Sequence, residues 1–163
     1  MSKIEVNEIA ARSGSTVSLA SGVTPSGFVP AGGIIQTVIN TSTSTVSTSS
    51  TSPSDLITAS ISPKFNNSVI HIEGYVSRMQ VAYGSSNAYA SLYITDPAGN
   101  NLTLGVLGTA AANSSPMSLF ATHSPSSTSS QTYKIRLSVA SGGTSSVSTD
   151  GQRYTIKIKE IAQ

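Results

Sequence analysis

The sequence predicts an all-β protein: a jelly-roll-like antiparallel β-sandwich preceded by an extended N-terminal arm. Three observations predict this fold class. Apolar and polar residues alternate in short runs, which is the period of a half-buried strand. Turn-forming residues recur about every 8 to 12 residues, a spacing typical of sandwiches and jelly rolls. No stretch has the 3.6-residue period of an amphipathic helix. About eight or nine strands are therefore expected.

The clearest strands lie near the C-terminus. In residues 131–139, Tyr133, Ile135, Leu137 and Val139 fall on one side and polar residues on the other. Residues 153–161 alternate in the same way, and the break between the two runs contains paired glycines and an Asp-Gly turn. The pattern predicts that these two runs are partners in one antiparallel sheet.

The remaining strands follow from shorter runs. Residues 34–39 are rich in β-branched side chains and are expected to form a central strand. Residues 41–54 are nearly all Ser and Thr, which fits either a flexible loop or an exposed edge strand. Further strands are expected at 56–62, 69–76, 89–94, 102–107 and 116–121, with a strong turn signal at 96–101.

Composition restricts the function classes. Only 10% of the residues are charged, the net charge is +2, and roughly a third of the chain is Ser or Thr. A hydrophobic content of 37% favours a folded protein over a disordered one. No basic cluster suggests nucleic-acid binding, and no apolar run is long enough for membrane insertion. Cysteine is absent, and the N-terminus lacks the pattern of a secretion signal, so we expect folding in a cytoplasm.

Residues 1–31 differ from the rest and are predicted to be an attachment arm and linker, with residues 32–163 forming the sandwich. Four charged residues lie within the first twelve positions, and the next charge is Asp55. Glycines and prolines then follow one another closely from position 22 onward. The arm is either a disordered tail or an anchor that becomes ordered on a partner. The candidate attachment residues are Lys3, Ile4, Val6 and Ile9.

The sequence indicates no catalysis and no cofactor or metal. The two histidines, His71 and His123, lie in or at the ends of expected strands, and their proximity to a serine means little in so Ser-rich a chain. The carboxylates are scattered, without the local pairing that acid catalysis needs. The turn that begins at Asp96 lacks the spacing of a calcium loop, so a plain hairpin turn is expected.

Tyrosines are the best candidates for recognition. Tyr89 and Tyr93 share a strand face opposite Leu92, where such rings can stack on sugars or fill a protein interface. No charged residue occurs between positions 97 and 133, and interface cores are depleted in charge. We therefore expect Tyr89, Tyr93, Leu102 and Leu119 to form a subunit interface or a recognition surface.

Several segments together resemble the tail-fibre-type domain of marine and cyanobacterial tailed phages. They are 30–38 (PAGGIIQTV) with the Ser/Thr tract after it, 57–64 (ITASISPK), 66–70 (NNSVI), 123–135 (HSPSSTSSQTYKI) and 158–162 (IKEIA). The N-terminal segments 3–9 (KIEVNEI) and 13–17 (SGSTV) resemble the beginnings of the same proteins. The resemblance implies a virion structural protein, usually fibre-like.

The sequence thus predicts a non-enzymatic, fibre-like virion protein. It is expected to be a homotrimer, assembled in the host cytoplasm, attached to other phage proteins of the tail or capsid, and in contact with a host-surface glycan as a candidate partner. A capsid decoration (cement) protein is the alternative, because no repeated shaft separates the arm from the domain. A carbohydrate-binding module is a second alternative.

Overall fold

The computed structural model describes residues 29–163 except 83–88, 109–112, 140–142 and 148–150. The described residues form strands and turns. They contain no helix that is long and apolar enough to cross a membrane. The strands are β1 (Ile34–Ser42), β2 (Val46–Thr48), β3 (Ser54–Ile61), β4 (Val69–Ala82), β5 (Tyr89–Thr95), β6 (Asn101–Gly108), β7 (Asn113–His123), β8 (Gln131–Val139), β9 (Thr144–Val147) and β10 (Tyr154–Ile161).

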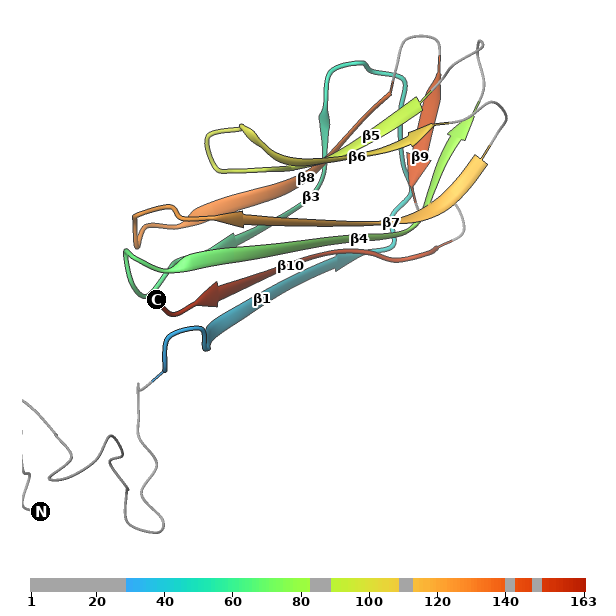
Figure 1. The fold of residues 1–163 in the computed structure, drawn as a ribbon. Helices are drawn as coiled ribbons and strands as arrows, with labels where there is room; N and C mark the ends of the chain where they lie inside the picture. The colour runs from blue at the N-terminus through green and yellow to red at the C-terminus, as the bar shows by residue number, and fades with distance from the viewer. Residues whose placement is uncertain (1–28, 83–88, 109–112, 140–142, 148–150) are drawn as a thin grey trace, which may run out of the picture.

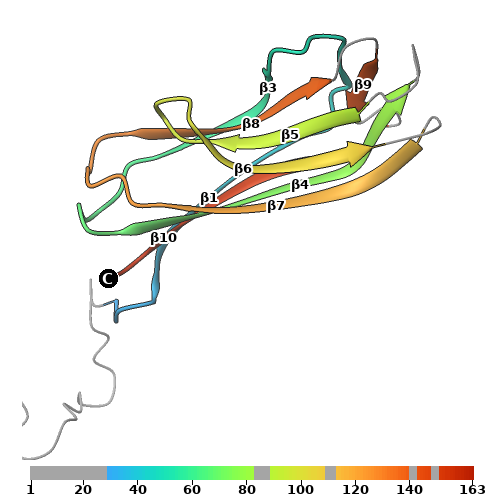
Figure 2. The ribbon, with the colours of Figure 1, turned by 45° about the horizontal axis from the view of Figure 1, so that its top comes forward.

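The strands form two antiparallel sheets that pack face to face (Figure 1). One sheet contains β1, β10, β4 and β7 in that order, and the short strands β9 and β2 extend it beside the second half of β4. The other sheet has the order β3-β8-β5-β6. Figure 2 shows the two layers from another side, with β6 of one sheet beside β7 of the other.

The connectivity is that of a jelly roll. Leaving aside the short β2 and β9, the chain passes from one sheet to the other at every step except the β5–β6 hairpin. Two four-stranded sheets, β1-β10-β4-β7 and β3-β8-β5-β6, result from this alternation. The predicted fold class, an antiparallel jelly-roll-like sandwich, is confirmed by the strand pairings themselves.

The core lies between the sheets and is built from one face of each strand. In β8 the predicted set Tyr133, Ile135, Leu137 and Val139 is buried, with at most 2% of each residue exposed. In β4 an irregularity between Val76 and Met79 changes which residues face inward, so that Met79 and Val81 are buried although they lie out of step with Ile70 and Ile72.

The predicted pairing of residues 131–139 with 153–161 is wrong. β8 pairs with β3 and β5, whereas β10 pairs with β1 and β4 in the opposite sheet. The two apolar faces meet across the core instead of lying side by side. The connection between the runs is too long for a tight hairpin, and part of it forms β9, which adds to the far half of β4.

Residues 34–39 form part of an edge strand, not the predicted central strand. Within the described residues β1 pairs only with β10, and its residues Ile34 and Ile39 are 55% and 59% exposed. The Ser/Thr tract 41–54 contains the end of β1, a loop and the short strand β2, so both of its interpretations apply in part. Val46 of β2 packs against the core.

The sides of β1 and β3 are joined by side chains. The amide nitrogen of Gln36 donates to the carbonyl of Ser62, and that of Asn40 donates to the carbonyl of Thr58, at 2.7 Å each. Glu160 of β10 is completely buried beside them and accepts hydrogen bonds from Gln36, Ser68 and the backbone NH groups of Lys64 and Phe65. These bonds fix the β3–β4 connection to the first sheet.

The carboxylate of Glu160 stays ionised in this environment. Burial alone would raise its pKa, but the hydrogen bonds from Ser68, Gln36, Lys64 and Phe65 outweigh burial and lower the pKa below its ordinary value. A buried carboxylate with this many donors stabilises the fold only while it is charged. Glu160 is therefore a structural anchor and not a reactive group.

Candidate functional site

Strand β6 turns small residues toward the core and larger apolar residues toward the outside. Thr103 and Gly105 face the core, opposite the buried residues Ile94 and Leu92 of β5, whereas Leu104 and Val106 face outward. Leu104 is 54% exposed and Val106 is 52% exposed. The local reason is close packing, because a Cβ at position 105 would lie only 2.7 Å from both Leu119 Cδ2 and Met117 Sδ of β7. A strand that turns its larger apolar side chains to the outside provides a surface for a partner.

The exposed residues of β6 continue an aromatic face on β5. Tyr93 lies opposite Leu104, and Tyr89, which is 47% exposed, lies opposite Gly108. Directly opposed side chains on adjacent strands are in contact distance. We call Tyr89, Tyr93, Leu104 and Val106 the β5–β6 patch. No residue of this patch is charged.

Polar residues border the β5–β6 patch on the β8 side. The Tyr93 hydroxyl lies 3.3 Å from the hydroxyl of Ser138, which is 4% exposed. Beyond it, Asp55 accepts hydrogen bonds from Lys134 at 2.6 Å and from Arg136 at 2.9 Å. The bond from Lys134 is the main cause that keeps the pKa of Asp55 below its ordinary value, against a smaller effect of burial. The patch thus has an apolar centre and a charged margin, as interfaces do.

The structure brings two of the four predicted interface residues together. Tyr89 and Tyr93 lie in the β5–β6 patch, whereas Leu102 is half-buried and packs against the core. Leu119 is 6% exposed and belongs to the core itself, where it contacts the position of Gly105. The candidate attachment residues Lys3, Ile4, Val6 and Ile9 lie outside the described residues.

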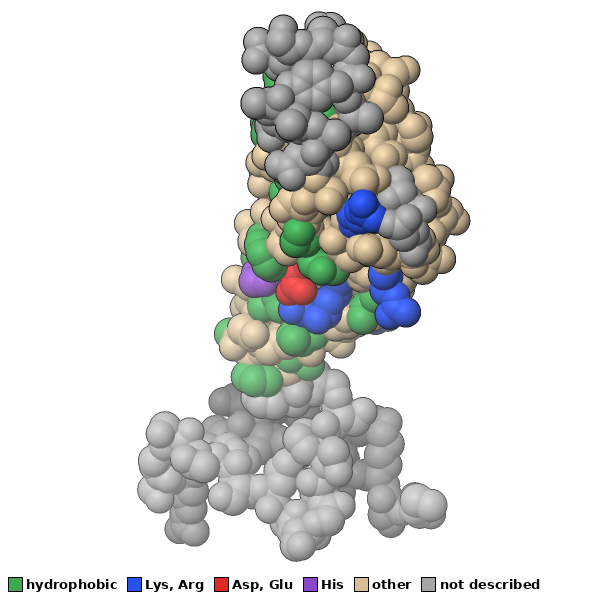
Figure 3. Space-filling model, turned by 90° about the vertical axis from the view of Figure 1, so that its right-hand side faces the viewer, with side chains coloured by type: hydrophobic (Ala, Val, Ile, Leu, Met, Phe, Trp, Pro, Cys, Tyr) green, Lys and Arg blue, Asp and Glu red, His purple; other side chains and the backbone are tan. Residues whose placement is uncertain are grey.

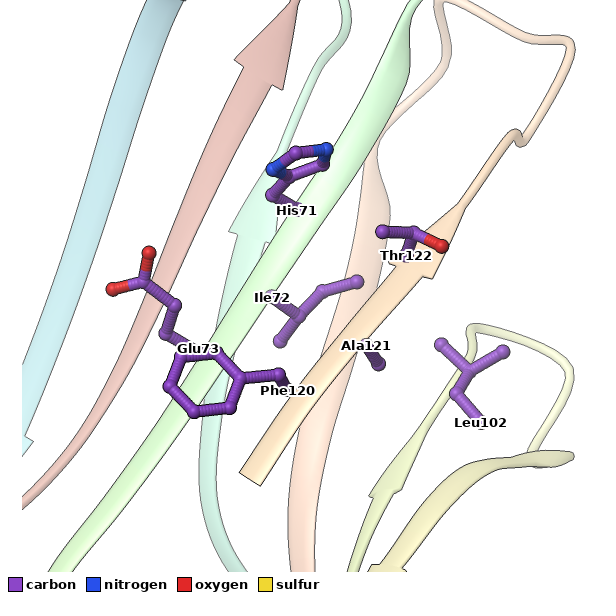
Figure 4. Close-up of a pocket in the computed structure, with 7 residues that line it drawn as sticks. All are labelled: His71, Ile72, Glu73, Leu102, Phe120, Ala121 and Thr122. Atoms are coloured by element: carbon purple, nitrogen blue, oxygen red, sulfur yellow. The ribbon is translucent and has the colours of Figure 1, made fainter. Parts of the chain in front are cut away.

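A second surface of interest is a groove over β4 and β7. It has a volume of about 390 Å³ and is lined by His71, Ile72, Glu73, Leu102, Phe120, Ala121 and Thr122. Figure 4 shows Phe120 beside Glu73, with His71 and Thr122 farther along the same two strands. Strand pairing sets Phe120 opposite Glu73 and Thr122 opposite His71. The groove therefore combines an aromatic ring with polar side chains, the mixture typical of small-molecule sites.

Charged and hydrophobic side chains also gather together on the molecular surface. In the face shown in Figure 3, acidic and histidine side chains lie beside basic and hydrophobic ones, and further basic side chains lie to the right of them. On the outer face of the first sheet, Glu73 is ion-paired with Lys159, and its other oxygen lies 3.8 Å from Lys157. The bond from Lys159 is the main cause that lowers the pKa of Glu73.

His123 has a structural partner. Its Nδ1 lies 2.9 Å from the hydroxyl of Tyr133, and the two rings meet edge to face with centroids 5.7 Å apart. Burial, with a smaller effect of the nearby Asp96 charge, raises the pKa of Tyr133, so its phenol stays neutral. Asp96 itself holds the predicted turn, accepting from the backbone and side chain of Asn100. Across the described part of the chain, no three His, Asp or Glu side chains gather as metal ligands would.

Sequence reasoning missed Phe120, Leu104, Val106 and Glu160, and alternation contained the signal only for Phe120 and Glu160. Phe120 lies between Leu119 and Ala121, so alternation sets its ring on the face opposite Met117, Leu119 and Ala121, and it is 68% exposed. Glu160 shares the parity of Ile156 and Ile158, which predicts a buried carboxylate. For β6, by contrast, alternation alone favours the wrong face, because the larger apolar residues point outward.

Comparison with known proteins gives only distant likenesses. No protein-family model matches the chain, and no curated protein matches it. Among solved structures it is similar to that of the infectious bursal disease virus Gx strain, at 12% identity and a TM-score of 0.40, over 88% of this chain and 42% of that one. The T13 particle of the same virus gives 11% identity and a TM-score of 0.41, over 89% and 40%. Its VP2 subviral particle gives 13% and 0.37, over 90% and 43%.

This chain thus spans about two fifths of the length of the viral chains that it matches. The fold assignment rests on the strand pairings described above, which place the chain among the jelly-roll sandwiches independently of these distant likenesses.

Proposed function

We propose that this chain is a non-enzymatic virion structural protein: a short, trimeric, fibre-like protein attached to a phage particle by residues 1–31, with its sandwich domain facing the host surface. The resemblance of its sequence segments to phage tail-fibre-type domains supports this proposal, and a jelly-roll sandwich suits it. The observation that most directly supports assembly is the orientation of strand β6, which places Leu104 and Val106 outside beside Tyr89 and Tyr93.

The β5–β6 patch is the proposed contact between subunits. Its four side chains are apolar or aromatic, and strand β6 contains no charged residue. Association through such a patch removes apolar area from water and raises stability with concentration. Three copies around a common axis provide the stability that a domain without disulfides gains from assembly. Leu102 packs half-buried against the core, and Leu119 supports β6 from the core at the position of Gly105.

The experiment is a measurement of molar mass by light scattering. We expect the full chain at micromolar concentration to have three times the 16.6 kDa mass of one chain. Leu104→Glu and Tyr93→Glu should each release monomers, because an unpaired charge in a desolvated contact costs about 3 to 5 kcal/mol. Phe65→Glu is the matched control: Phe65 is 51% exposed but lies in the β3–β4 connection. A monomeric wild type, or trimers that persist in Leu104→Glu, would contradict the proposal.

A capsid decoration protein is the second candidate, favoured by one feature of the sequence. The glycines and prolines of residues 22–33 lead directly from the arm into β1, without a repeated shaft. The copy number per purified particle distinguishes the two: a few tens of copies indicate the tail, whereas hundreds indicate the capsid. Deleting residues 1–31 should abolish incorporation in both cases and leave the jelly roll soluble.

A further inference from the structure

The outer face of the β1-β10-β4-β7 sheet has an ordered arrangement of side chains. Strand register places Ile39, Lys157, Glu73 and Phe120 in one row across the four strands. The next row contains Thr41, Thr155, Tyr75 and Ser118. Phe120 is 68% exposed and Tyr75 is 46% exposed. Two exposed aromatic rings therefore lie diagonally next to each other on neighbouring strands, beside a cluster of charges.

The groove described above begins at the Phe120 ring. Its outer wall is polar, with Glu73, His71 and Thr122 beside Phe120, and Leu102 of β6 lies at its other side. Aromatic faces stack on the C–H groups of a sugar ring, and imidazole, hydroxyl and carboxylate groups bond its hydroxyls. An apolar ligand would cover the imidazole of His71 and the hydroxyl of Thr122 without bonding them, which costs binding energy. The composition of the groove thus favours a saccharide.

The charge beside the groove indicates which kind of saccharide. Glu73 is held by Lys159 and faces Lys157, so this group of three has a net charge of +1. The side chain of Lys157 is 35% exposed and forms the longer of the two ion pairs of Glu73, at 3.8 Å, so its ammonium keeps donors for an added anion. Lys157 lies two strands from Phe120, roughly 10 Å away by strand spacing. A ligand that stacks on Phe120 and reaches Lys157 has more than one sugar ring and a negative charge.

We propose that this groove binds an anionic oligosaccharide, one ring stacking on Phe120 and a carboxylate or sulfate of a neighbouring ring bonding Lys157. His71 and Thr122 contact hydroxyls of the stacked ring. The biological meaning of this inference rests on the proposed function, the display of the protein at the particle surface. The binding test is independent of subunit association, because the β5–β6 patch lies on the opposite sheet. Subunit association and saccharide binding can therefore fail separately.

The experiment is titration calorimetry with two probes of equal length, an oligogalacturonate and a neutral malto-oligosaccharide. We expect the oligogalacturonate to bind the full-length protein more tightly. Phe120→Ala should weaken it by roughly tenfold, the worth of one aromatic contact. Lys157→Gln should remove the preference for the anionic probe. Phe65→Ala is the matched control, because Phe65 is 51% exposed and lies in the β3–β4 connection.

Several results would overturn the inference. They are absence of binding by either probe, unchanged binding in Phe120→Ala, or an equal loss in Phe65→Ala. Binding that persists in Phe120→Ala and disappears only with added salt would show attraction to the lysines alone. The molar mass of each variant is also measured by light scattering. If Phe120→Ala releases monomers, the groove is a subunit contact and the saccharide assignment is wrong.

Discussion

The two long sides of the sandwich are closed by different kinds of contact. On the side of β1 and β3, the amides of Gln36 and Asn40 bond carbonyls at the edge of the opposite sheet, and buried Glu160 bonds the connection between β3 and β4. On the side of β6 and β7, Gly105 lets the two strands approach, and Leu119 and Met117 pack against it. No side chain bonds across that second side between the described residues of β6 and β7.

The difference has a consequence for assembly. Edge strands present unpaired backbone groups, which invite association unless they are covered. On the β1/β3 side, the carbonyls of Thr58 and Ser62 accept hydrogen bonds from amides of the same chain. The β6/β7 side has uncharged strands flanked by exposed Leu104, Val106 and Phe120. Polar bonds thus close one side, and the other exposes apolar side chains, among them Leu104 and Val106 of the proposed subunit contact.

Removing the side chain of Glu160 should cause the largest loss of stability among the variants that compare the two sides. Glu160→Ala removes the acceptor of the buried Ser68 hydroxyl and of the backbone NH groups of Lys64 and Phe65, and it leaves the Gln36 amide with its bond to the Ser62 carbonyl. We expect a loss of about 3 to 5 kcal/mol in the free energy of unfolding, measured with denaturant at fixed protein concentration. This loss is a large share of an ordinary stability of about 5 to 15 kcal/mol.

Glu73→Ala is the matched control for Glu160, on the outer face of the same sheet. Its carboxylate is ion-paired at the surface, where such pairs are worth about 0 to 1 kcal/mol. A loss below about 1 kcal/mol in Glu160→Ala, or equal losses in the two variants, would show that the bonds of Glu160 do not hold the β1/β3 side together.

Packing on the other side is tested at Gly105. An added Cβ would meet the ends of Leu119 and Met117, which are flexible side chains, so Gly105→Ala should be tolerated. Gly105→Val adds two methyl groups and should cost about 1 to 3 kcal/mol through overpacking. Unfolding curves of both variants test this. Equal stability of Gly105→Val and the wild type would mean that the β6/β7 side is loosely packed.

Much of the fold follows from alternation in the sequence. The inward faces of β8 and β10 are the predicted ones, since one sheet face must be apolar. The pairing of strands does not follow, because alternation states which residues face the core but not which sheet contains them. Residues 131–139 and 153–161 have the same pattern and lie in opposite sheets. The length of the connection between these two runs argues against a hairpin.

The candidate site was predicted only in part, for a physical reason. The sequence predicted the outward position of Tyr89 and Tyr93, because they lie on the strand face opposite buried Leu92 and Ile94. The orientation of β6 depends on Gly105 meeting Leu119 from a strand more than ten residues away, which no local pattern contains. Leu119 looked like an interface residue because it lies in the uncharged window. That window includes both core and surface.

Acid should weaken the β1/β3 side through Glu160. Its pKa is lowered in the folded protein, so the unfolded chain binds more protons and stability rises with pH. The contribution is fully present above the ordinary value of 4.5 and is lost as the pH falls through the folded value. Asp55, Glu73 and Asp96 act in the same direction.

The contribution of Glu160 is isolated by a difference between two proteins. The free energy of unfolding is measured from pH 6 to about pH 3 for the wild type and for Glu160→Gln, which cannot titrate. We expect a shallower decline in Glu160→Gln below pH 4.5. Parallel curves would mean that the acid sensitivity comes from the three surface and turn carboxylates instead.

The smallest expected effect is at Asn40, and it gives the sharpest comparison between the two sides. Asn40→Ala removes one amide that bonds the Thr58 carbonyl at 2.7 Å, and water can replace that bond because Asn40 is exposed. We expect a loss of about 0.5 to 1.5 kcal/mol in the free energy of unfolding, with no change in molar mass. Leu104→Ala is its counterpart on β6, and it should weaken association while leaving the stability of the isolated chain nearly unchanged, since Leu104 is 54% exposed. If Asn40→Ala instead produced larger assemblies in light scattering, the amides would be preventing association at the β3 edge, a stronger role than the stabilising one expected here.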